Sequence, residues 1–291
     1  MTFIKRKIEL TFGLGKGDFG LAGEDVLIVN SARVECNITQ TVGPSLGQAH
    51  VRVYGLSESL LNQLSALNNV QMAARMNRLL IKAGDEKSGM ATVFNGQIQL
   101  CQIDMASAPD VALNIHAYGA LLEKLRTLEP RSYPGSADAA VILQNLANDA
   151  GYLFENSGVS VMLETPYYPG SILEQIQRCA KDANVEHVVD VTTNPNTLAI
   201  WPRGGSRGGA VPLISPATGL VGYPSYSSGM GGITVKCVFN PTLRYASRVK
   251  VESSLKVANR EWVIFNLSHE LDSEMPGGHW FTRFDGFAYA I

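Results

Sequence analysis

The chain has 291 residues, of which 45% are hydrophobic and 17% are charged, and its formal net charge is −2. It contains no run of about 18 apolar residues and no excess of basic residues, so we expect neither a membrane-spanning helix nor a specific nucleic-acid-binding face. Four cysteines are too few for a disulfide scaffold, and we predict that they are buried thiols of a protein folded in a reducing cytosol.

The first 120 residues are predicted to form mainly β-strands, because short β-branched runs alternate with turn residues. The predicted strands cover residues 3–12, 25–30, 32–40, 50–54, 78–83, 91–104 and 111–119. In the third of these, Val34, Cys36 and Ile38 alternate with polar residues, which is typical of a strand with one buried face. The start of the chain is basic but has no apolar segment after it, so it predicts a first strand and not a secretory signal.

One helix is predicted within this β region. Leucines occur at helical spacing in residues 57–67, and Ser57 or Ser59 can cap the first turn.

Residues 121–209 have the pattern of a small α+β domain. Helices are predicted over 136–150 and 171–184, with apolar stripes at Val141, Leu143, Leu146 and Ala150, and at Ile172, Ile176, Cys179 and Ala183. A short strand over 160–163 and a hairpin of 185–191 with 197–201 complete it. Residues 131–135 and 203–209 are predicted to be linkers, the second one flexible and basic.

Residues 210–291 again predict strands, and their spacing resembles that of the first domain. Residues starting at His50, Arg78, Phe94 and Asn114 match in pattern those starting at Ile233, Arg248, Phe265 and Asp285. The last three matches are separated by 170 or 171 residues. The first match is separated by 183 residues, which an insertion of the 57–67 helix in the first copy explains. The sequence therefore predicts a duplicated β-domain.

A family resemblance rests on phrases in the last 80 residues. These are Ser-Pro-Ala-Thr-Gly-Leu-Val-Gly-Tyr-Pro (215–224), Gly-Ile-Thr-Val-Lys-Cys-Val-Phe-Asn-Pro (232–241), Trp-Val-Ile-Phe-Asn-Leu-Ser-His-Glu-Leu (262–271) and Pro-Gly-Gly-His-Trp (276–280). They resemble the C-terminal part of phage baseplate hub proteins, the central hub and late-control-D-like proteins related to the base of type VI secretion spikes. The resemblance is strongest over 212–291 and extends to the whole chain through its domain order.

The resemblance implies a mainly β protein with two related β-barrel tube domains, 1–120 and 210–291, and a small α+β domain with a linker, 121–209, inserted between them. It also implies a non-enzymatic homotrimer whose six barrels form a pseudo-six-fold ring that joins the tail tube to the central spike and lets DNA pass. The expected partners are a tail tube or distal tail protein, the spike protein and the C-terminus of a tape-measure protein. The expected location is the virion tail baseplate, after assembly in the host cytoplasm.

Motifs for metal or nucleotide chemistry are weak in this sequence. The five histidines, His50, His116, His187, His269 and His279, lack a metal-ligand spacing. In a strand, His269 and Glu270 would point to opposite faces. Gly13, Gly15 and Gly17 with Lys16 resemble a phosphate loop, but no Ser or Thr follows the lysine and no helix is predicted after it. We therefore predict no catalytic, cofactor-binding or metal-binding residues.

Two alternative functions remain open at this point. A tail-associated cell-wall hydrolase would need paired carboxylates, for which Asp18, Glu24 and Asp25 are the candidates. A glycan-binding adhesion module would use aromatic residues near turns, and the same residues could instead anchor a protein interface. These are Tyr167, Tyr168, Tyr223, Tyr226 and Trp280. Arg203 and Arg207 could face a DNA channel, although the linker composition favours plain solvation.

Overall fold

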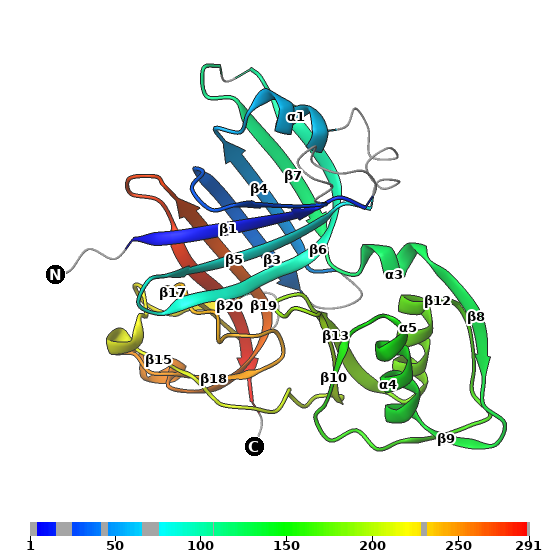
Figure 1. Cartoon of the computed structure of the whole chain (residues 1–291). Helices are drawn as coiled ribbons and strands as arrows, with labels where there is room; N and C mark the ends of the chain where they lie inside the picture. Colours follow the sequence, from blue (N-terminus) through cyan, green and yellow to red (C-terminus); the bar gives the residue numbers. More distant parts are fainter. Residues whose placement is uncertain are drawn as a thin grey trace.

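The computed structural model describes residues 5–15, 25–41, 46–65, 76–106, 108–227 and 232–289 (Figure 1). The described residues form one sheet of thirteen strands, one of three strands and two of two strands, with a few short helices. The prediction of a mainly β protein is therefore confirmed. Within the described residues, no helix is both long and apolar enough to cross a membrane.

The N-terminal strands form as their apolar alternation predicts. The elements are β1 (Arg6–Gly13), β2 (Val26–Val29), β3 (Val34–Thr41), β4 (Gln48–Tyr54), α1 (Glu58–Leu64), β5 (Arg78–Asp85), β6 (Gly89–Asp104) and β7 (Ala112–Tyr118). In β3, Val34, Cys36 and Ile38 are buried and the residues between them are not. Ser57 caps α1, since its side chain accepts a hydrogen bond from the Leu60 N–H. Position 67, the predicted helix end, lies outside the described residues.

The N-terminal part of the sheet curls around one core. Its strand order is β3-β4-β7-β6-β5-β1-β2, so four strands separate β3 from β1. Nevertheless, the inward side chains of β3 and β1 belong to the same buried cluster, with Ile38 and Phe12 among its members. A flat sheet could not bring them together, so the sheet must bend back on itself.

The middle unit lies to one side of the large sheet (Figure 1). Its elements are α3 (Leu121–Leu125), β8 (Thr127–Ser132), β9 (Ser136–Asp138), α4 (Ala139–Asp149), β10 (Leu153–Asn156), β11 (Met162–Glu164), β12 (Tyr167–Ser171), α5 (Ile172–Asp182), β13 (Val185–Asp190) and β14 (Thr197–Pro202). The hairpin of β13 and β14 is confirmed. The stripe of α5 is buried as predicted, and its first turn is closed by a capping box of Ser171 and Glu174.

Three predictions for this unit are wrong. Residues 131–135 are not a linker, because Arg131 and Ser132 belong to β8, which pairs with β12. The helix does not begin at Ser136, because residues 136–138 pair with β11 and Asp138 caps the helix from outside. Val141 is exposed, because it does not lie on the buried face of α4, which is formed by Ala139, Ala140, Ile142, Leu143, Leu146 and Ala147.

The segment 203–209 is also not a flexible, solvated linker. The Arg207 side chain is only 1% exposed, and its Nη1 donates to Asp190 Oδ2 at 2.7 Å. Its Nη2 and Nε donate to the Glu155 carboxylate at 2.7 and 3.0 Å. The Arg207 backbone N–H donates to the Ala246 carbonyl, so this residue ties the middle unit to the C-terminal region. Arg203, in contrast, is exposed as predicted.

The C-terminal region forms a second curled part of the same large sheet. Its elements are β15 (Leu213–Ile214), η1 (Pro216–Thr218), β16 (Ser225–Ser227), β17 (Gly232–Val238), β18 (Arg248–Val251), η2 (Lys256–Ala258), β19 (Arg260–Ser273) and β20 (Trp280–Ala288). Residues from β15 and from β17 to β20 share one buried cluster.

The two β regions are joined by direct strand pairing. β19 pairs antiparallel with β3, from Asn266 opposite Thr41 to Ser273 opposite Val34. The described strands thus form one open path from β16 to β2 and no closed barrel. The expectation of two related β-barrel domains is not met among the described residues, because a single long strand, β19, pairs with strands of both regions and joins them into one sheet.

The strand order of the N-terminal region recurs in the C-terminal region. The order β4-β7-β6-β5 has the same connections as β17-β20-β19-β18. A β-bulge also recurs at the corresponding place, at Gln99 where β6 pairs with β7 and at Phe265 where β19 pairs with β20. The internal repeat predicted from the sequence is therefore present in the topology.

The residue matches that suggested the repeat are mostly out of register. The bulge aligns Gln99 with Phe265, whereas the sequence match aligned Phe94 with Phe265, five residues away. The match of Arg78 with Arg248 is in register, because each lies opposite the residue two positions before its bulge. Apolar alternation has a period of two, so it identifies strands without fixing their register.

Candidate functional site

The polar face of the continuous sheet is the main candidate surface. Glu270, Asn37, His50 and His116 lie directly opposite one another in turn across β19, β3, β4 and β7. Side chains at paired positions point to the same face of a sheet. This row therefore crosses the junction between the two β regions and places polar groups of both on one surface.

His50 and His116 form a pair on this face. Their ring centroids are 4.2 Å apart. Burial, followed by the neighbouring His116, lowers the pKa of His50, so the His50 imidazole is neutral near pH 7. Within the described residues, no group of three or more His, Cys, Asp or Glu side chains is arranged to hold a metal ion.

The arginine on this face is paired with acidic and polar groups. Arg52 donates to Asn114 Oδ1 at 3.0 Å and to Asp104 Oδ2 at 3.2 Å, and its Nη1 lies 3.9 Å from Glu35. Glu35 also accepts a hydrogen bond from the Tyr54 hydroxyl at 3.1 Å. Because the Arg52 charge is matched locally, it offers a weak site for a phosphate. The sequence contains no local signal for this network, since its members come from four different strands, β3, β4, β6 and β7.

Of the other histidines, His279 lines the same surface pocket as this row, whereas His269 lies apart from it. His269 is 2% exposed and faces the core, while Glu270 lies on the polar face, as the strand pattern predicted. The His269 ring nitrogen Nδ1 is 2.9 Å from Thr282 Oγ1. His279 Nδ1 is 2.9 Å from Asp272 Oδ2.

Acidification should destabilise the protein through His269. Burial lowers the pKa of His269 to about 4, well below the usual 6.5 of the unfolded state. Between these values the unfolded chain binds a proton that the folded chain does not, so the free energy of unfolding falls as pH drops from 6.5 to 4, by up to about 3 kcal/mol. Urea denaturation at pH 7 and at pH 4.5 measures this loss.

A His269→Gln variant is the control for that experiment. It should show a smaller loss of stability between the two pH values. Part of the decrease in unfolding free energy with falling pH should remain in the variant, because burial also lowers the pKa of His187. Equal slopes for the variant and the natural protein would contradict the assignment to His269.

The candidate phosphate loop and carboxylates are only partly within the described residues. Lys16, Gly17, Asp18 and Glu24 lie outside them. Gly13 ends β1, and the Gly15 N–H donates to Asn77 Oδ1 at 3.3 Å. The hydrogen bond from Gly15 to Asn77 holds the end of β1 to the start of β5. Among the described residues, this segment does not have the geometry of a nucleotide site.

Two of the five candidate aromatic residues are buried. Tyr168 is 1% exposed within β12, and Trp280 is 4% exposed and belongs to the N-terminal core. The suggestion that these two residues contact a glycan or a protein partner is therefore wrong, because their side chains are buried. Tyr167, Tyr223 and Tyr226 are exposed and remain candidates for an interface.

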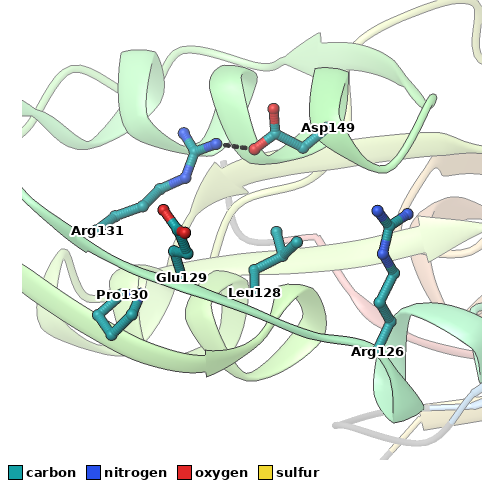
Figure 2. A pocket seen from close by; sticks show the side chains of 6 residues that line it. All are labelled: Arg126, Leu128, Glu129, Pro130, Arg131 and Asp149. Carbon is teal, nitrogen blue, oxygen red and sulfur yellow. Dashed lines mark ion pairs between the residues drawn. The ribbon is translucent and has the colours of Figure 1, made fainter.

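A shallow pocket lies on the middle unit (Figure 2). It has a volume of about 470 Å³ and is lined by Arg126, Leu128, Glu129, Pro130, Arg131 and Asp149. Figure 2 shows the Arg131 guanidinium directed at the Asp149 carboxylate, with which it forms an ion pair. Two arginines and two acids line the pocket, so it offers no net charge for an ionic ligand.

The four cysteines are buried and form no disulfide. Burial raises the pKa of Cys237 and Cys179 to about 12, so these thiols are protonated and unreactive at neutral pH. The prediction of buried thiols is confirmed.

Three solved structures share this fold at low sequence identity. A tail protein from Neisseria meningitidis MC58 is 8% identical, covers 96% of both chains and gives a TM-score of 0.62. The 43 kDa tail protein of prophage MuSo2 from Shewanella oneidensis is 10% identical, covers 96% of both chains and gives 0.57. A chain of the half-lidded Francisella PdpA–VgrG complex is 9% identical with a TM-score of 0.55, and the match covers 99% of the present chain and 59% of that chain.

The sequence itself matches one family. The Baseplate hub gp41 family model matches residues 8–277, which is most of the chain. No curated protein sequence matches the present chain.

Proposed function

This chain belongs to the Baseplate hub gp41 family and is a structural component of a phage tail baseplate, and on that premise we propose that three copies form the ring that joins the tail tube to the central spike. The ring has three-fold symmetry in its chains and pseudo-six-fold symmetry in its β regions. One side fits the tail tube or a distal tail protein, and the other side fits the spike. Its work is structural and uses no cofactor.

The repeated strand order is the observation that carries this proposal. Each chain supplies two β regions with the same order, β4-β7-β6-β5 and β17-β20-β19-β18, already joined edge to edge through β3 and β19. Three such chains present six similar units, which is the number needed to adapt a six-fold tube to a three-fold spike. We propose 1–120 and 210–291 as the two tube-like domains, with 121–209 as the domain between them.

We further propose that the polar face of the sheet lines the channel through which DNA passes. Its row of Glu270, Asn37, His50 and His116 crosses both β regions, and Arg52 on the same face is paired with Asp104. A channel wall should hold DNA weakly, because each unpaired cation would add an attraction to the phosphates. The C-terminus of a tape-measure protein is a further proposed partner within the channel.

The mass of the purified protein tests the ring. Native mass spectrometry should give a trimer, either alone or after addition of the spike protein. The spike is included because ring closure can depend on it. A monomer in both conditions would contradict the proposal.

A further inference from the structure

The histidine pair on the polar face of the sheet carries chemistry that the proposed ring does not use. His50 on β4 lies directly opposite His116 on β7, so both side chains leave the sheet on the same face. The two ring centroids are 4.2 Å apart, and the rings are inclined at 69°. Within the described residues, the histidine side chains that form hydrogen bonds are His269 and His279, so the ring nitrogens of this pair have no protein partner there.

The pair lines an open pocket whose charge favours a cation. The pocket has a volume of about 600 Å³, and its acidic side chains are Glu35, Glu270 and Asp272. Apart from the histidines, Arg52 is the one basic side chain among the described residues that line it. The Arg52 guanidinium already forms an ion pair with Asp104. Carboxylates therefore outnumber cations around the two imidazoles, and the local field attracts positive charge.

We propose that His50 and His116 together bind one divalent transition-metal ion of the class that imidazole prefers, such as Zn²⁺. A Zn–N bond is about 2.0–2.1 Å long, so the two ligating nitrogens of a tetrahedral site lie about 3.4 Å apart. Rings whose centroids are 4.2 Å apart reach that separation by rotation about side-chain bonds, while β4 and β7 stay in place. Water fills the other positions around the ion, since His50 is exposed to solvent.

The kind of ion follows from the kind of ligand. Imidazole nitrogen suits Zn²⁺, Cu²⁺ and Ni²⁺, whereas Mg²⁺ and Ca²⁺ are bound by oxygen atoms. Two protein ligands are fewer than the four of a closed structural zinc site, so the ion should exchange with solvent. A search for ligand spacing within one segment misses this pair, because its two members lie on different strands.

A bound ion would link two neighbouring strands of the N-terminal region. β4 pairs with β7 on one side and with β3 on the other, and β3 in turn pairs with β19 of the C-terminal region. The two imidazoles are close together only when β4 and β7 are paired, so the ion binds the folded chain in preference to the unfolded chain. Such an ion raises the free energy of unfolding.

Isothermal titration calorimetry of the full-length protein with ZnCl₂ tests the site. The titration is done at about pH 7.5, because a histidine ligand must be neutral to bind a metal. We expect one Zn²⁺ ion per chain and no heat of binding when MgCl₂ replaces ZnCl₂. His50→Gln and His116→Gln should each raise the dissociation constant for Zn²⁺ at least tenfold, because each removes one of the two imidazoles.

His279→Gln is the matched control for these variants. The His279 side chain is 64% exposed and lines the same pocket, but its Nδ1 already lies 2.9 Å from Asp272 Oδ2. This substitution should leave the dissociation constant for Zn²⁺ within twofold of that of the natural protein. Circular dichroism of all three variants shows whether each one retains the β structure.

The unfolding temperature gives a second readout. Zn²⁺ should raise it for the natural protein and for His279→Gln, and should leave it unchanged for His50→Gln and His116→Gln. A natural protein that binds no Zn²⁺ at millimolar concentration would overturn the proposal. So would Zn²⁺ binding that survives both substitutions of the pair, or that His279→Gln weakens as much as they do. None of these outcomes bears on the ring, which the mass measurement tests separately.

Discussion

Replacing Arg207 with alanine is expected to lower the free energy of unfolding by about 3–5 kcal/mol. The Arg207 and Asp190 side chains are each 1% exposed, so the substitution leaves the Asp190 carboxylate buried without its partner. It also removes three hydrogen bonds to Glu155 and Asp190 and the hydrogen bond from Arg207 Nη1 to the Tyr245 carbonyl, which links β10 and β13 to the C-terminal region. Chemical denaturation followed by circular dichroism measures the loss.

The loss should depend on pH in a way that identifies Asp190. Burial alone would raise the pKa of Asp190, but the Arg207 charge and the hydrogen bonds from Thr192 and Arg207 outweigh it and hold the pKa below its ordinary value. Without Arg207, burial is less opposed and the pKa rises. A raised carboxyl pKa costs stability as pH increases through that range, so the deficit should be larger at pH 7 than at pH 4.

Arg203 is the matched control for this experiment. It lies in the same segment, is 70% exposed and is 3.9 Å from Glu186. Arg203→Ala should change stability by no more than about 0.5 kcal/mol. Equal effects of the two substitutions would show that the Arg207 cluster does not hold the middle unit to the C-terminal region.

The two arginines also show where sequence reasoning ends. Both stand in a glycine-rich run, and composition alone predicts a flexible linker for such a run. The residues that bury Arg207 lie 17 and 52 positions away, in β13 and β10. Since no local pattern relates an arginine to such partners, the buried cluster could not be predicted.

Local patterns were reliable where the physical cause was local. Alternation predicted β3 and its buried face, and Ser57 and Ser171 were recognised as positions where helices begin. Short strands such as β10 were missed, because four residues carry too little alternation to stand out. The start of α4 is predicted at Ser136 and lies at Ala139. The sequence does not distinguish the two, since Asp138 can cap a helix from outside or occupy its first turn.

The candidate surface could not be predicted from the strands alone, because it also depends on the order of the strands in the sheet. His50 and His116 are 66 positions apart in the sequence, and only the pairing of β4 with β7 brings them together. The repeat was detectable because strand lengths and turns recur. Its register was not, because the bulges at Gln99 and Phe265 leave no clear sequence signal.

The junction between the two β regions should be most sensitive at Trp280. This residue belongs to β20 of the C-terminal region, yet its side chain is 4% exposed in the N-terminal core, where Leu271 of β19 joins it. It packs against Phe239, and the Arg6 guanidinium lies over its ring at 5.6 Å from the centroid. Trp280→Ala is expected to cost about 3–5 kcal/mol, because a large cavity would remain between the regions.

Two neighbouring substitutions distinguish packing at the junction from a general effect on β20. Trp280→Phe keeps an aromatic ring in the core and should recover more than half of the loss. Phe281→Ala removes a ring from the opposite face of the same strand, where Lys236 lies over it, and should cost about 1 kcal/mol or less. If Phe281→Ala were as costly as Trp280→Ala, the sensitivity would belong to β20 as a whole. If only Trp280 is sensitive, the two β regions are held together because a C-terminal side chain completes the N-terminal core. The proposed ring of three chains would then need only one further kind of junction to close.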